Sequence, residues 1–480
     1  MKMRAILLFL AFLSGIPFLG QGQSPLAFKN VTVIAMTGPV TQPGMTVVVQ
    51  GNRIVALGKT GKTKVPKNAT VVDGQGKFLI PGLWDMHVHT VMDRAAAPTM
   101  LQLCVINGVT GARDMHGDLE VGKQMRAEIA DGKRIGPRLF ISGKLIDGPK
   151  AINPTGTSVK NEAEARQAVR DLKTGGADFV KVYSRLPHDL YLDIADESKK
   201  QGMTFVGHVP YSVSAAEASD VGQKSIEHLT GILLASSTKE TELRNQFIAS
   251  SEQPYRFAEF LQSEYLPLDS YSQEKADALF ARFVRNKTYQ VPTLVVLRSM
   301  TNLMDHAPAD NRMKYIPPSI LKFWTGMEPF LAKQTTPADF ASYKRVWEKS
   351  FQLVREMHQA GVPILAGTDT PNPNVFPGFS LHDELALFVQ AGLTPMQALQ
   401  TATTIPAQYF SMEREVGTVS VGKLADLVVL DANPLTDIHN TRKINAVVAN
   451  GHLLTKETLE KMLNDIATAN AATPTAKDAK

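Results

Sequence analysis

The chain has 480 residues but only one cysteine, Cys104, so an intramolecular disulfide is excluded. It has no block of lysines and arginines, and its formal net charge of +5 is small for this length. We therefore expect no binding to nucleic acid. Beyond the first residues, no segment is apolar enough to cross a bilayer, so no membrane span is expected after a signal is removed. Stability must come from apolar residues, which make up 44% of the chain, and from any bound metal.

The first residues follow the pattern of a secretory signal peptide. Lys2 and Arg4 precede an apolar run, 5–20, that a glycine and a proline interrupt, and small and polar residues follow it. The run is short for a membrane anchor. We therefore predict a signal peptide over residues 1–23 and a periplasmic or secreted mature protein.

Short alternating apolar runs, separated by turn residues, occupy residues 24–80, and a second β-rich stretch lies within 413–455. We predict that these two stretches pair into one small β-sandwich domain. Residues 456–480 are predicted to form an exposed helix, over 455–467, and a disordered tail from Asn470.

Residues 81–412 alternate strand and helix patterns, which predicts an α/β fold of the (β/α)8 TIM-barrel type. Two long intervals, 230–287 and 299–349, are predicted to be helical insertions that shape a substrate cleft. The eight expected strands are Leu83–His87, Val109–Arg113, Arg138–Ser142, Phe179–Tyr183, Thr204–Val206, Ser225–His228, Gln290–Val296 and Ile364–Ala366.

Two histidines, His87 and His89, stand two residues apart at the end of the first expected strand. Side chains at this spacing on a strand point to the same face. One strand end can therefore present both imidazoles to a single metal ion. Such a pair is a weak signal alone, because surface His-x-His pairs are common.

Further polar residues stand at the ends of other expected strands. Lys181 lies in the fourth strand, His208 follows the fifth, His228 closes the sixth and Asp369 follows the eighth. Barrel enzymes place their catalytic groups at the carboxyl ends of the strands. We therefore expect four imidazoles, one amine and one carboxylate to converge on one cavity.

Three segments carry a family resemblance. They are the Pro-Gly-x-x-Asp-x-His-x-His run of 81–89, the segment Gly108–Asp114 and the segment Gly417–Leu430. With them the chain resembles the amidohydrolase superfamily, and within it the imidazolonepropionase-like branch that includes prolidase-like dipeptidases. The resemblance extends from Phe28 to about Leu454.

The resemblance implies a centre of two divalent metal ions, with zinc as the first expectation. His87, His89 and Asp369 would hold the more buried ion and His208 and His228 the other. Lys181 would bridge both after carboxylation by carbon dioxide. The donor types agree with this, since neutral imidazole and carboxylate suit zinc.

The chemistry implied by such a centre needs a carbamate rather than a free amine. A lysine amine is protonated near neutral pH and bridges cations poorly, whereas a carbamate is anionic and offers two oxygens. Two metal ions that share a water lower its pKa, so that metal-bound hydroxide attacks a carbonyl. Asp369 is the expected catalytic base, taking the proton of the attacking water and giving it to the leaving nitrogen.

The substrate-contacting candidates are His116, Tyr183, Arg185 and Tyr211, each with a structural alternative. His116 follows the second strand. Tyr183 lies two residues beyond Lys181, and its alternatives are the inward face of Lys181 and core packing. Arg185 suits a substrate carboxylate unless it is simply exposed. Prolidase-like relatives hold a carboxylate with a tyrosine near the position of Tyr211, although a Val-Pro pair here disturbs the register. Asp85 is predicted to be structural.

The sequence thus predicts an exported metal-dependent amidohydrolase. It would hydrolyse a carbon–nitrogen bond in a small substrate. The preferred expectation for this substrate is a dipeptide (Xaa-Pro-like) or an N-acyl amino acid. Hydrolysis of a cyclic amide, as by imidazolonepropionase, or of a lactone or phosphotriester is the alternative within enzymes. A noncatalytic metal- or ligand-binding protein on the same scaffold is the alternative of another class. Whether the chain forms a homo-oligomer is left open by the sequence.

Overall fold

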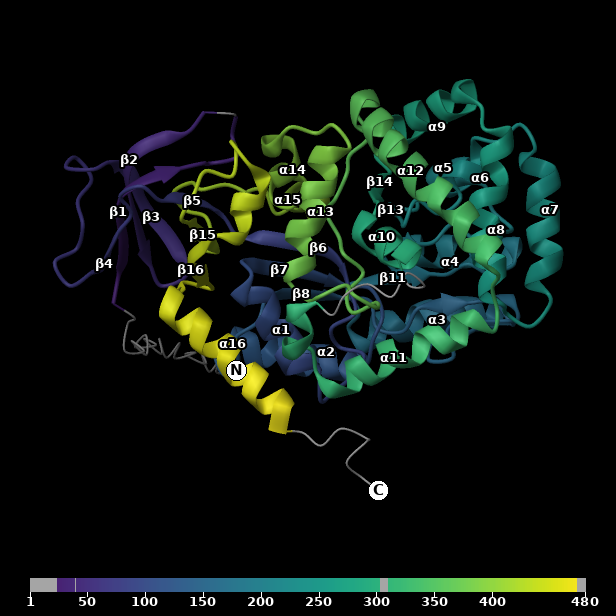
Figure 1. Cartoon of the computed structure of the whole chain (residues 1–480), viewed down its shortest axis with the longest axis horizontal. Helices are drawn as coiled ribbons and strands as arrows, with labels where there is room; N and C mark the ends of the chain where they lie inside the picture. Colours follow the sequence, from purple (N-terminus) through teal and green to yellow (C-terminus); the bar gives the residue numbers. More distant parts are fainter. Residues whose placement is uncertain (1–23, 39, 303–309, 473–480) are drawn as a thin grey trace, which may run out of the picture.

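The computed structural model describes residues 24–38, 40–302 and 310–472, so the predicted signal peptide and the last residues of the predicted tail lie outside the described residues. The chain is mixed α/β, with a β-sheet at one end of the long axis and helices at the other (Figure 1). None of the helices in these ranges combines the length and the apolar character needed to cross a bilayer.

Both ends of the chain contribute to one eight-stranded sheet, where purple and yellow strands lie side by side in Figure 1. β5 (Phe78–Pro81) pairs antiparallel with β15 (Leu427–Leu430), and the order is β17-β16-β15-β5-β1-β2-β3 with β4 beside β1. The predicted pairing of the two ends is therefore present, as a single paired sheet; an arrangement of two facing sheets stays a prediction. The other strands are β1 (Leu26–Val33), β2 (Gln42–Gln50), β3 (Arg53–Lys59), β4 (Thr70–Asp73), β16 (Ile444–Ala449) and β17 (His452–Thr455).

Short parallel strands occupy the middle of the molecule. One sheet has the order β6-β7-β8, and another has the order β10-β9-β11-β12-β13-β14. Their bounds are β6 (Leu83–Val88), β7 (Val109–Asp114), β8 (Arg138–Ile141), β9 (Ile146–Asp147), β10 (Thr157–Ser158), β11 (Phe179–Val182), β12 (Thr204–Gly207), β13 (Ser225–Glu227) and β14 (Tyr289–Val291).

Backbone hydrogen bonds connect these two sheets at both ends. The Asp178 amide donates to the Ile141 carbonyl (2.8 Å), which joins the start of β11 to the end of β8. On the other side, the Leu365 amide donates to the Gln290 carbonyl and the Met86 amide to the Ala366 carbonyl, both at 2.9 Å. The parallel segments therefore succeed one another in the order expected for a TIM-barrel-type fold.

Two of the expected strands differ most from their prediction. The segment Ile364–Ala366 makes an isolated bridge at Ile364 instead of a regular strand. β14 ends at Val291, and a helix begins three residues later. Pro292 lacks an amide hydrogen and Thr293 has a φ of 48°, so the pairing cannot continue past Val291.

Side chains from different strands fill the space that the parallel segments enclose. Trp84 and Met86 from β6 pack with Phe179, Val206 and Leu365 in one buried cluster. Alternation along each strand sends these residues inward. They form a solid apolar layer, and the polar strand ends lie beyond it.

Helices follow most of the parallel strands. α3 shows the local logic: the Asn161 side chain accepts from the Glu164 amide at the helix start, Ala165 and Val169 are buried, and Gly176, with a φ of 89°, ends the helix. The helices of this group are α1 (Ala97–Ile106), α2 (Leu119–Ala130), α3 (Glu162–Gly175), α4 (His188–Lys200), α5 (Ala215–Asp220), α13 (Phe379–Gln390), α14 (Pro395–Thr401) and α15 (Thr404–Tyr409).

The described parts of the two long intervals, 230–287 and 299–349, are largely helical. In Figure 1 the first group, α7 to α9, lies at the end of the molecule opposite the eight-stranded sheet. The first interval holds α6 (Ile232–Ala235), α7 (Glu240–Ser251), α8 (Phe257–Tyr265), η1 (Leu266–Ser270) and α9 (Gln273–Asn286); the second holds α10 (Leu294–Asn302), η2 (Asn311–Tyr315), α11 (Pro318–Ala332) and the start of α12 (Pro337–Ala360).

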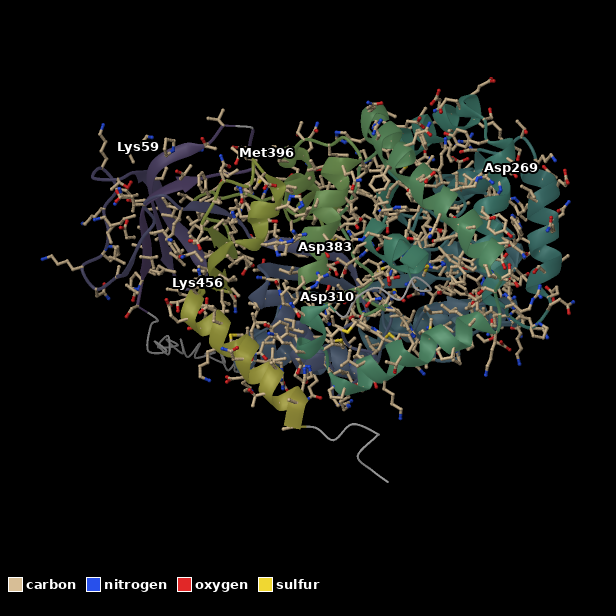
Figure 2. All side chains as sticks on the ribbon, viewed as in Figure 1. Lys59, Asp269, Asp310, Asp383, Met396 and Lys456 are labelled. Atoms are coloured by element: carbon tan, nitrogen blue, oxygen red, sulfur yellow. The ribbon has the colours of Figure 1, made fainter. Side chains whose placement is uncertain are left out.

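The last helix differs from its prediction. α16 (Lys456–Ala472) continues past 467 into the segment predicted to be disordered, and Leu459, Met462 and Ile466 are buried. They pack against apolar residues of α1, so this helix has a buried face rather than full exposure. Figure 2 labels Lys456 at its start, below the sheet.

Ion pairs also connect segments that are far apart in the sequence, near the middle of the molecule. Asp383 of α13, labelled in Figure 2, accepts from Arg442 of η3 (Ile438–Arg442) at 2.5 Å and from Arg312 of η2 at 3.0 Å. This carboxylate therefore joins the C-terminal segment to the second helical insertion.

Gly111 of β7 gives a first test of this packing. A Cβ at this position would lie 2.3 Å from the Trp84 ring. We expect Gly111→Ala to lower the free energy of unfolding by about 1–3 kcal/mol, because the core layer around Trp84 would be overpacked. The measurement is denaturant unfolding.

The matched control is Gly326→Ala on α11, where no atom lies within 4 Å of the added Cβ. Alanine is the better helix former, so this variant should be neutral or stabilised by up to about 1 kcal/mol. Equal stability of the two variants would contradict the packing described around Trp84.

Candidate active site

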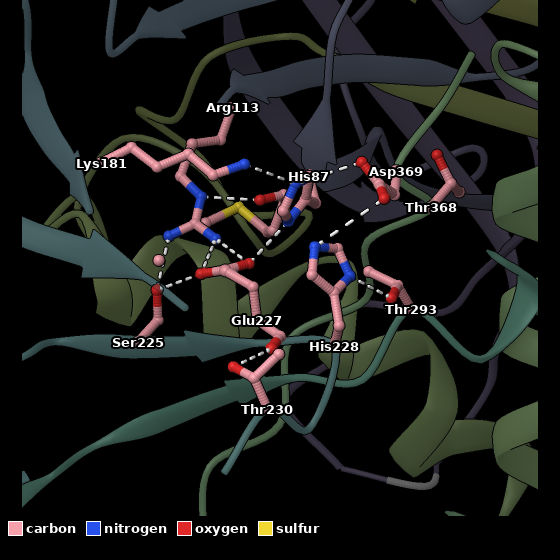
Figure 3. A network of polar contacts seen from close by, with 12 residues as sticks. His87, Arg113, Lys181, Ser225, Glu227, His228, Thr230, Thr293, Thr368 and Asp369 are labelled. Carbon is pink, nitrogen blue, oxygen red and sulfur yellow. Dashed lines mark hydrogen bonds and ion pairs between the residues drawn. The ribbon is translucent and has the colours of Figure 1, made fainter. Parts of the chain in front are cut away.

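Three predicted metal ligands meet at the end of β6. Asp369 Oδ1 lies 3.3 Å from His87 Nε2 and 3.0 Å from His89 Nε2 (Figure 3 shows His87 and Asp369). One ligand atom from each of these residues lies within 4.8 Å of the others, which is the spacing that a single metal ion requires. His87 is fully buried and His89 is accessible from the cavity beyond it.

The other three predicted ligands adjoin this group. Lys181 Nζ lies 3.3 Å from His87 Nε2 and is buried. His228 Nε2 lies 3.8 Å from Asp369 Oδ2, and the ring of His208 is centred 5.0 Å from that of His228. Strand ends that are far apart in the sequence thus bring together all six residues predicted as ligands.

Each of the four imidazoles is anchored through Nδ1 by an oxygen atom. Metal-ligating histidines have this arrangement, because the outer contact fixes the ring and leaves Nε2 for the ion. The oxygen that contacts His89 Nδ1 is the backbone carbonyl of His116, which can only accept a hydrogen bond. His89 therefore carries its proton on Nδ1. The contacts of Nδ1 are His87 with Glu227 Oε2 (2.8 Å), His89 with the His116 carbonyl (3.1 Å), His208 with Ser184 Oγ (2.8 Å) and His228 with Thr293 Oγ1 (2.7 Å).

Burial sets the charge of these groups. It lowers the pKa of His87 and His208 well below the usual range and that of His228 to about 4, so the rings are neutral, which is the form that binds metals. Burial also lowers the pKa of Lys181 to about 8. Burial raises the pKa of Asp369, but the opposing effects of His228 and His89 outweigh burial. The net shift of the pKa is downward, so the side chain is a carboxylate.

Two residues that the sequence analysis did not single out support the centre. Glu227 of β13 accepts from His87, and its two oxygens lie 2.8 and 2.9 Å from Arg113 Nη2 (Figure 3). Arg113 of β7 is itself fully buried and donates to the Met86 carbonyl at 2.6 Å. The signal for Arg113 was a charged residue inside an expected buried strand, since a buried charge needs a partner, whereas the polar sequence around Glu227 carried no such signal.

The backbone is strained where it delivers these groups. Asp369, His228 and Thr293 have φ values of 62°, 58° and 48°, in the left-handed region that residues with side chains seldom adopt. Asp85, predicted to be structural, accepts from the amide and the hydroxyl of Thr368 at 3.0 and 2.7 Å. It thereby ties β6 to the segment that carries Asp369.

Two of the four substrate-contacting candidates line the cavity next to the centre. Tyr183 does so with its ring 4.1 Å from that of His208. His116 also lines the cavity, but Nδ1 accepts from the Leu145 amide (3.1 Å) and Nε2 donates to Thr155 Oγ1 (2.8 Å). Both nitrogens of His116 are therefore occupied by structural contacts.

The structure places the other two candidates away from the substrate cavity. Arg185 is buried, and its guanidinium forms an ion pair with Glu259 at 2.5 Å, so it is neither exposed nor free to meet a carboxylate. Tyr211 packs against Phe247, with ring centres 6.0 Å apart, beside a separate small cavity. Its position three residues beyond His208, after a Val-Pro pair, turns it away from the centre, and Tyr255 occupies the cavity wall instead.

Comparison with known proteins supports one family. Residues 300–454 match the amidohydrolase family. This match and the relatives below support a member of the amidohydrolase superfamily. It is 22% identical over 385 residues to a 5'-deoxyadenosine deaminase of Methanobrevibacter smithii, covering 76% of this chain and 74% of that protein. It is 39% identical over 81 residues to an imidazolonepropionase of Symbiobacterium thermophilum, covering 17% and 19% respectively.

Solved structures extend the likeness to almost the whole chain. A bottromycin amidohydrolase aligns with a TM-score of 0.74 at 22% identity, covering 94% of this chain and 92% of that one. A Xaa-Pro dipeptidase aligns with a TM-score of 0.66 at 20% identity, covering 90% and 100%. These neighbours imply a TIM-barrel-type α/β fold, and the superfamily assignment supports a hydrolase that acts on carbon–nitrogen bonds.

Glu227 provides a direct test of the site. We expect Glu227→Gln to weaken zinc binding by about 10–100-fold, because the His87 ring would lose the carboxylate that orients it. Zinc affinity would be measured by competition with a chromogenic chelator.

The control for this test is Glu460→Gln on the exposed surface of α16, which should bind zinc like the unmodified chain. A folded Glu227→Gln protein with unchanged zinc affinity would show that the ring does not depend on this contact.

Proposed function

We propose that this chain is an exported, metal-dependent amidohydrolase that cleaves an amide or peptide bond in a small substrate. The convergence of four Nδ1-anchored histidines, Lys181 and Asp369 at one cavity carries the proposal. The signal pattern of residues 1–23 supports export. The likeness to a Xaa-Pro dipeptidase supports a dipeptide or N-acyl amino acid as the first substrate class.

The donor set fits two divalent cations, with zinc as the first candidate. His87, His89 and Asp369 would hold one, and His208 and His228 the other. A divalent cation bound here would polarise the substrate carbonyl and lower the pKa of a water molecule.

Lys181 suits the bridging position as a carbamate. Its buried amine, with a pKa lowered to about 8, exists partly in the neutral form near neutral pH. The neutral nitrogen attacks carbon dioxide, an N–C bond forms, and one proton is released to solvent. The product is an anion with two oxygens, which also removes a buried positive charge from beside His87.

Asp369 is the proposed proton carrier. Its carboxylate lies between His89 and His228 and lines the cavity, so it can accept a proton from an attacking water. The water oxygen bonds to the carbonyl carbon, the carbon–nitrogen bond breaks, and Asp369 returns the proton to the departing nitrogen. The products are a carboxylic acid and an amine, and the acid then releases its proton to solvent.

Other substrates of the same chemistry are the alternatives. The imidazolonepropionase likeness supports a cyclic amide, and an activated water also attacks lactones and phosphotriesters. A noncatalytic metal- or ligand-binding protein on the same scaffold is the alternative of another class, and the hydrolase relatives support turnover instead.

Removal of the base tests the proposed chemistry. We expect Asp369→Asn to lower kcat for amide hydrolysis by about 10²–10⁴-fold, because the amide side chain cannot carry the proton. The assay is a chromatographic screen of dipeptides, N-acyl amino acids and neutral amides with the zinc-loaded protein.

The matched control is Asp465→Asn on the outer face of α16, which should leave kcat unchanged. Chelation of zinc should abolish turnover in the unmodified chain. Wild-type rates in Asp369→Asn would remove this residue from the proposed mechanism.

Reconstitution tests the carbamate. After removal of metal, we expect zinc to restore activity faster with added bicarbonate than without, and faster at pH 8.5 than at pH 7. The neutral fraction of an amine with a pKa of about 8 rises with pH, and only the neutral amine attacks carbon dioxide. Equal recovery with and without bicarbonate, in carbon dioxide-free buffer, would contradict the carbamate.

A further inference from the structure

The cavity above the metal-ligand cluster has an apolar wall. Its volume is about 430 Å³, and the polar cluster forms its floor. Both helical insertions supply the wall with large apolar side chains that the mechanism does not use. They include Phe257, Phe260, Val296, Leu297, Met300 and Ile320.

The described residues of this wall offer an anionic group no cationic partner. Among the described residues that line the cavity, Lys181 is the one lysine or arginine, and it lies in the floor beside His87. The nearby Arg185 is committed to Glu259 and to the Gln253 carbonyl. It is therefore unavailable to a substrate carboxylate.

Among the described residues of the upper wall, the one charged side chain has the opposite sign. Asp93 lines the cavity and accepts from Ser319 Oγ at 2.7 Å and from the Ala95 amide at 2.8 Å. These contacts favour its ionised form. An anionic substrate would meet a like charge in the upper wall in addition to the cost of leaving water.

The apolar surface continues to the solvent. Met92 and Phe323 both line the cavity, and each keeps 49% of its surface exposed. Exposed large apolar side chains beside a cavity are typical of surfaces that bind apolar groups. An apolar substrate group longer than the cavity would therefore still find contacts at the mouth.

We infer that the substrate is an uncharged amide with bulky apolar groups, and that a free carboxylate on it disfavours binding. This inference rests on the proposed function and narrows it, away from free dipeptides and N-acyl amino acids. The scissile amide lies over the floor, and the apolar wall holds the remainder of the molecule.

Tyr255 is the strongest argument for the opposite preference. It lines the cavity beside Arg185, whose guanidinium lies 5.3 Å from its ring, and its hydroxyl can donate to a carboxylate, as can that of Tyr183 on the same cavity. Neutral hydroxyls supply hydrogen bonds and no charge, which does not replace the hydration of an anion. A neutral carbonyl is the better match for them.

A pair of substrates with the same scissile bond tests the inference. N-hexanoyl-phenylalanine carries a carboxylate, and its N,N-dimethylamide is neutral. We expect kcat/KM for release of hexanoate by the zinc-loaded protein to be at least tenfold higher for the dimethylamide. Its dissociation constant, measured by calorimetry, should be at least tenfold lower.

Variants that change the charge of the cavity wall provide a second test of the inference. Met300→Lys, which adds a cation to the wall, should shift the preference toward the carboxylate by at least tenfold, while Val421→Lys on the exposed surface should not. Tyr255→Phe should change kcat/KM for both substrates by the same factor. Thermal unfolding checks that each variant is folded.

The outcomes separate this inference from the proposed function. Tighter binding or faster cleavage of the carboxylate overturns the inference and leaves the hydrolase intact. Absence of turnover with tighter binding of the dimethylamide supports the inference and refutes the proposed function. Failure of the dimethylamide to bind up to its solubility limit also overturns the inference.

Discussion

The structure depends on one buried carboxylate, that of Glu227. It pairs with the guanidinium of Arg113 from β7 and accepts from Nδ1 of His87 on β6, and all three side chains are fully buried. A buried charge is tolerable only when every contact is made, so the three strands cannot shift relative to one another without leaving a charge unpaired. The Glu227 carboxylate thereby fixes both the register of the strands and the orientation of the His87 ring.

The cluster above it uses conformations that the fold must hold in place. Asp369 and His228 sit in left-handed backbone at the ends of their strands, and Asp85 ties the first of these segments to β6. Such strain is found where a side chain has to be aimed, and the solid apolar layer below supplies the rigidity that maintains it. The helical insertions then surround the cluster with a wall whose character differs from that of its floor, so the chemistry and the substrate preference are encoded in different parts of the chain.

The sequence predicted what periodicity and spacing carry. The pairing of the two chain ends, the helical insertions and the convergence of six strand-end residues were all expected, because strand direction determines where side chains after a strand lie. The roles of Arg185 and Tyr211 were not predictable, since their partners Glu259 and Phe247 come from the first insertion, more than thirty residues away in the chain. Glu227 was missed because a glutamate beside a histidine has no pattern of its own. The short eighth segment and the early end of β14 reflect backbone details at Pro292 and Thr293 that apolar runs do not reveal.

The central claim is that these six side chains hold metal ions. Anomalous diffraction from crystals of the zinc-loaded protein, recorded on both sides of the zinc absorption edge, tests it most directly. The structure leads us to expect two peaks, one among His87, His89 and Asp369 and one beside His208 and His228, with carbamate density on Lys181 between them. A map without a peak among these residues, or with zinc bound only elsewhere on the chain, would contradict the claim.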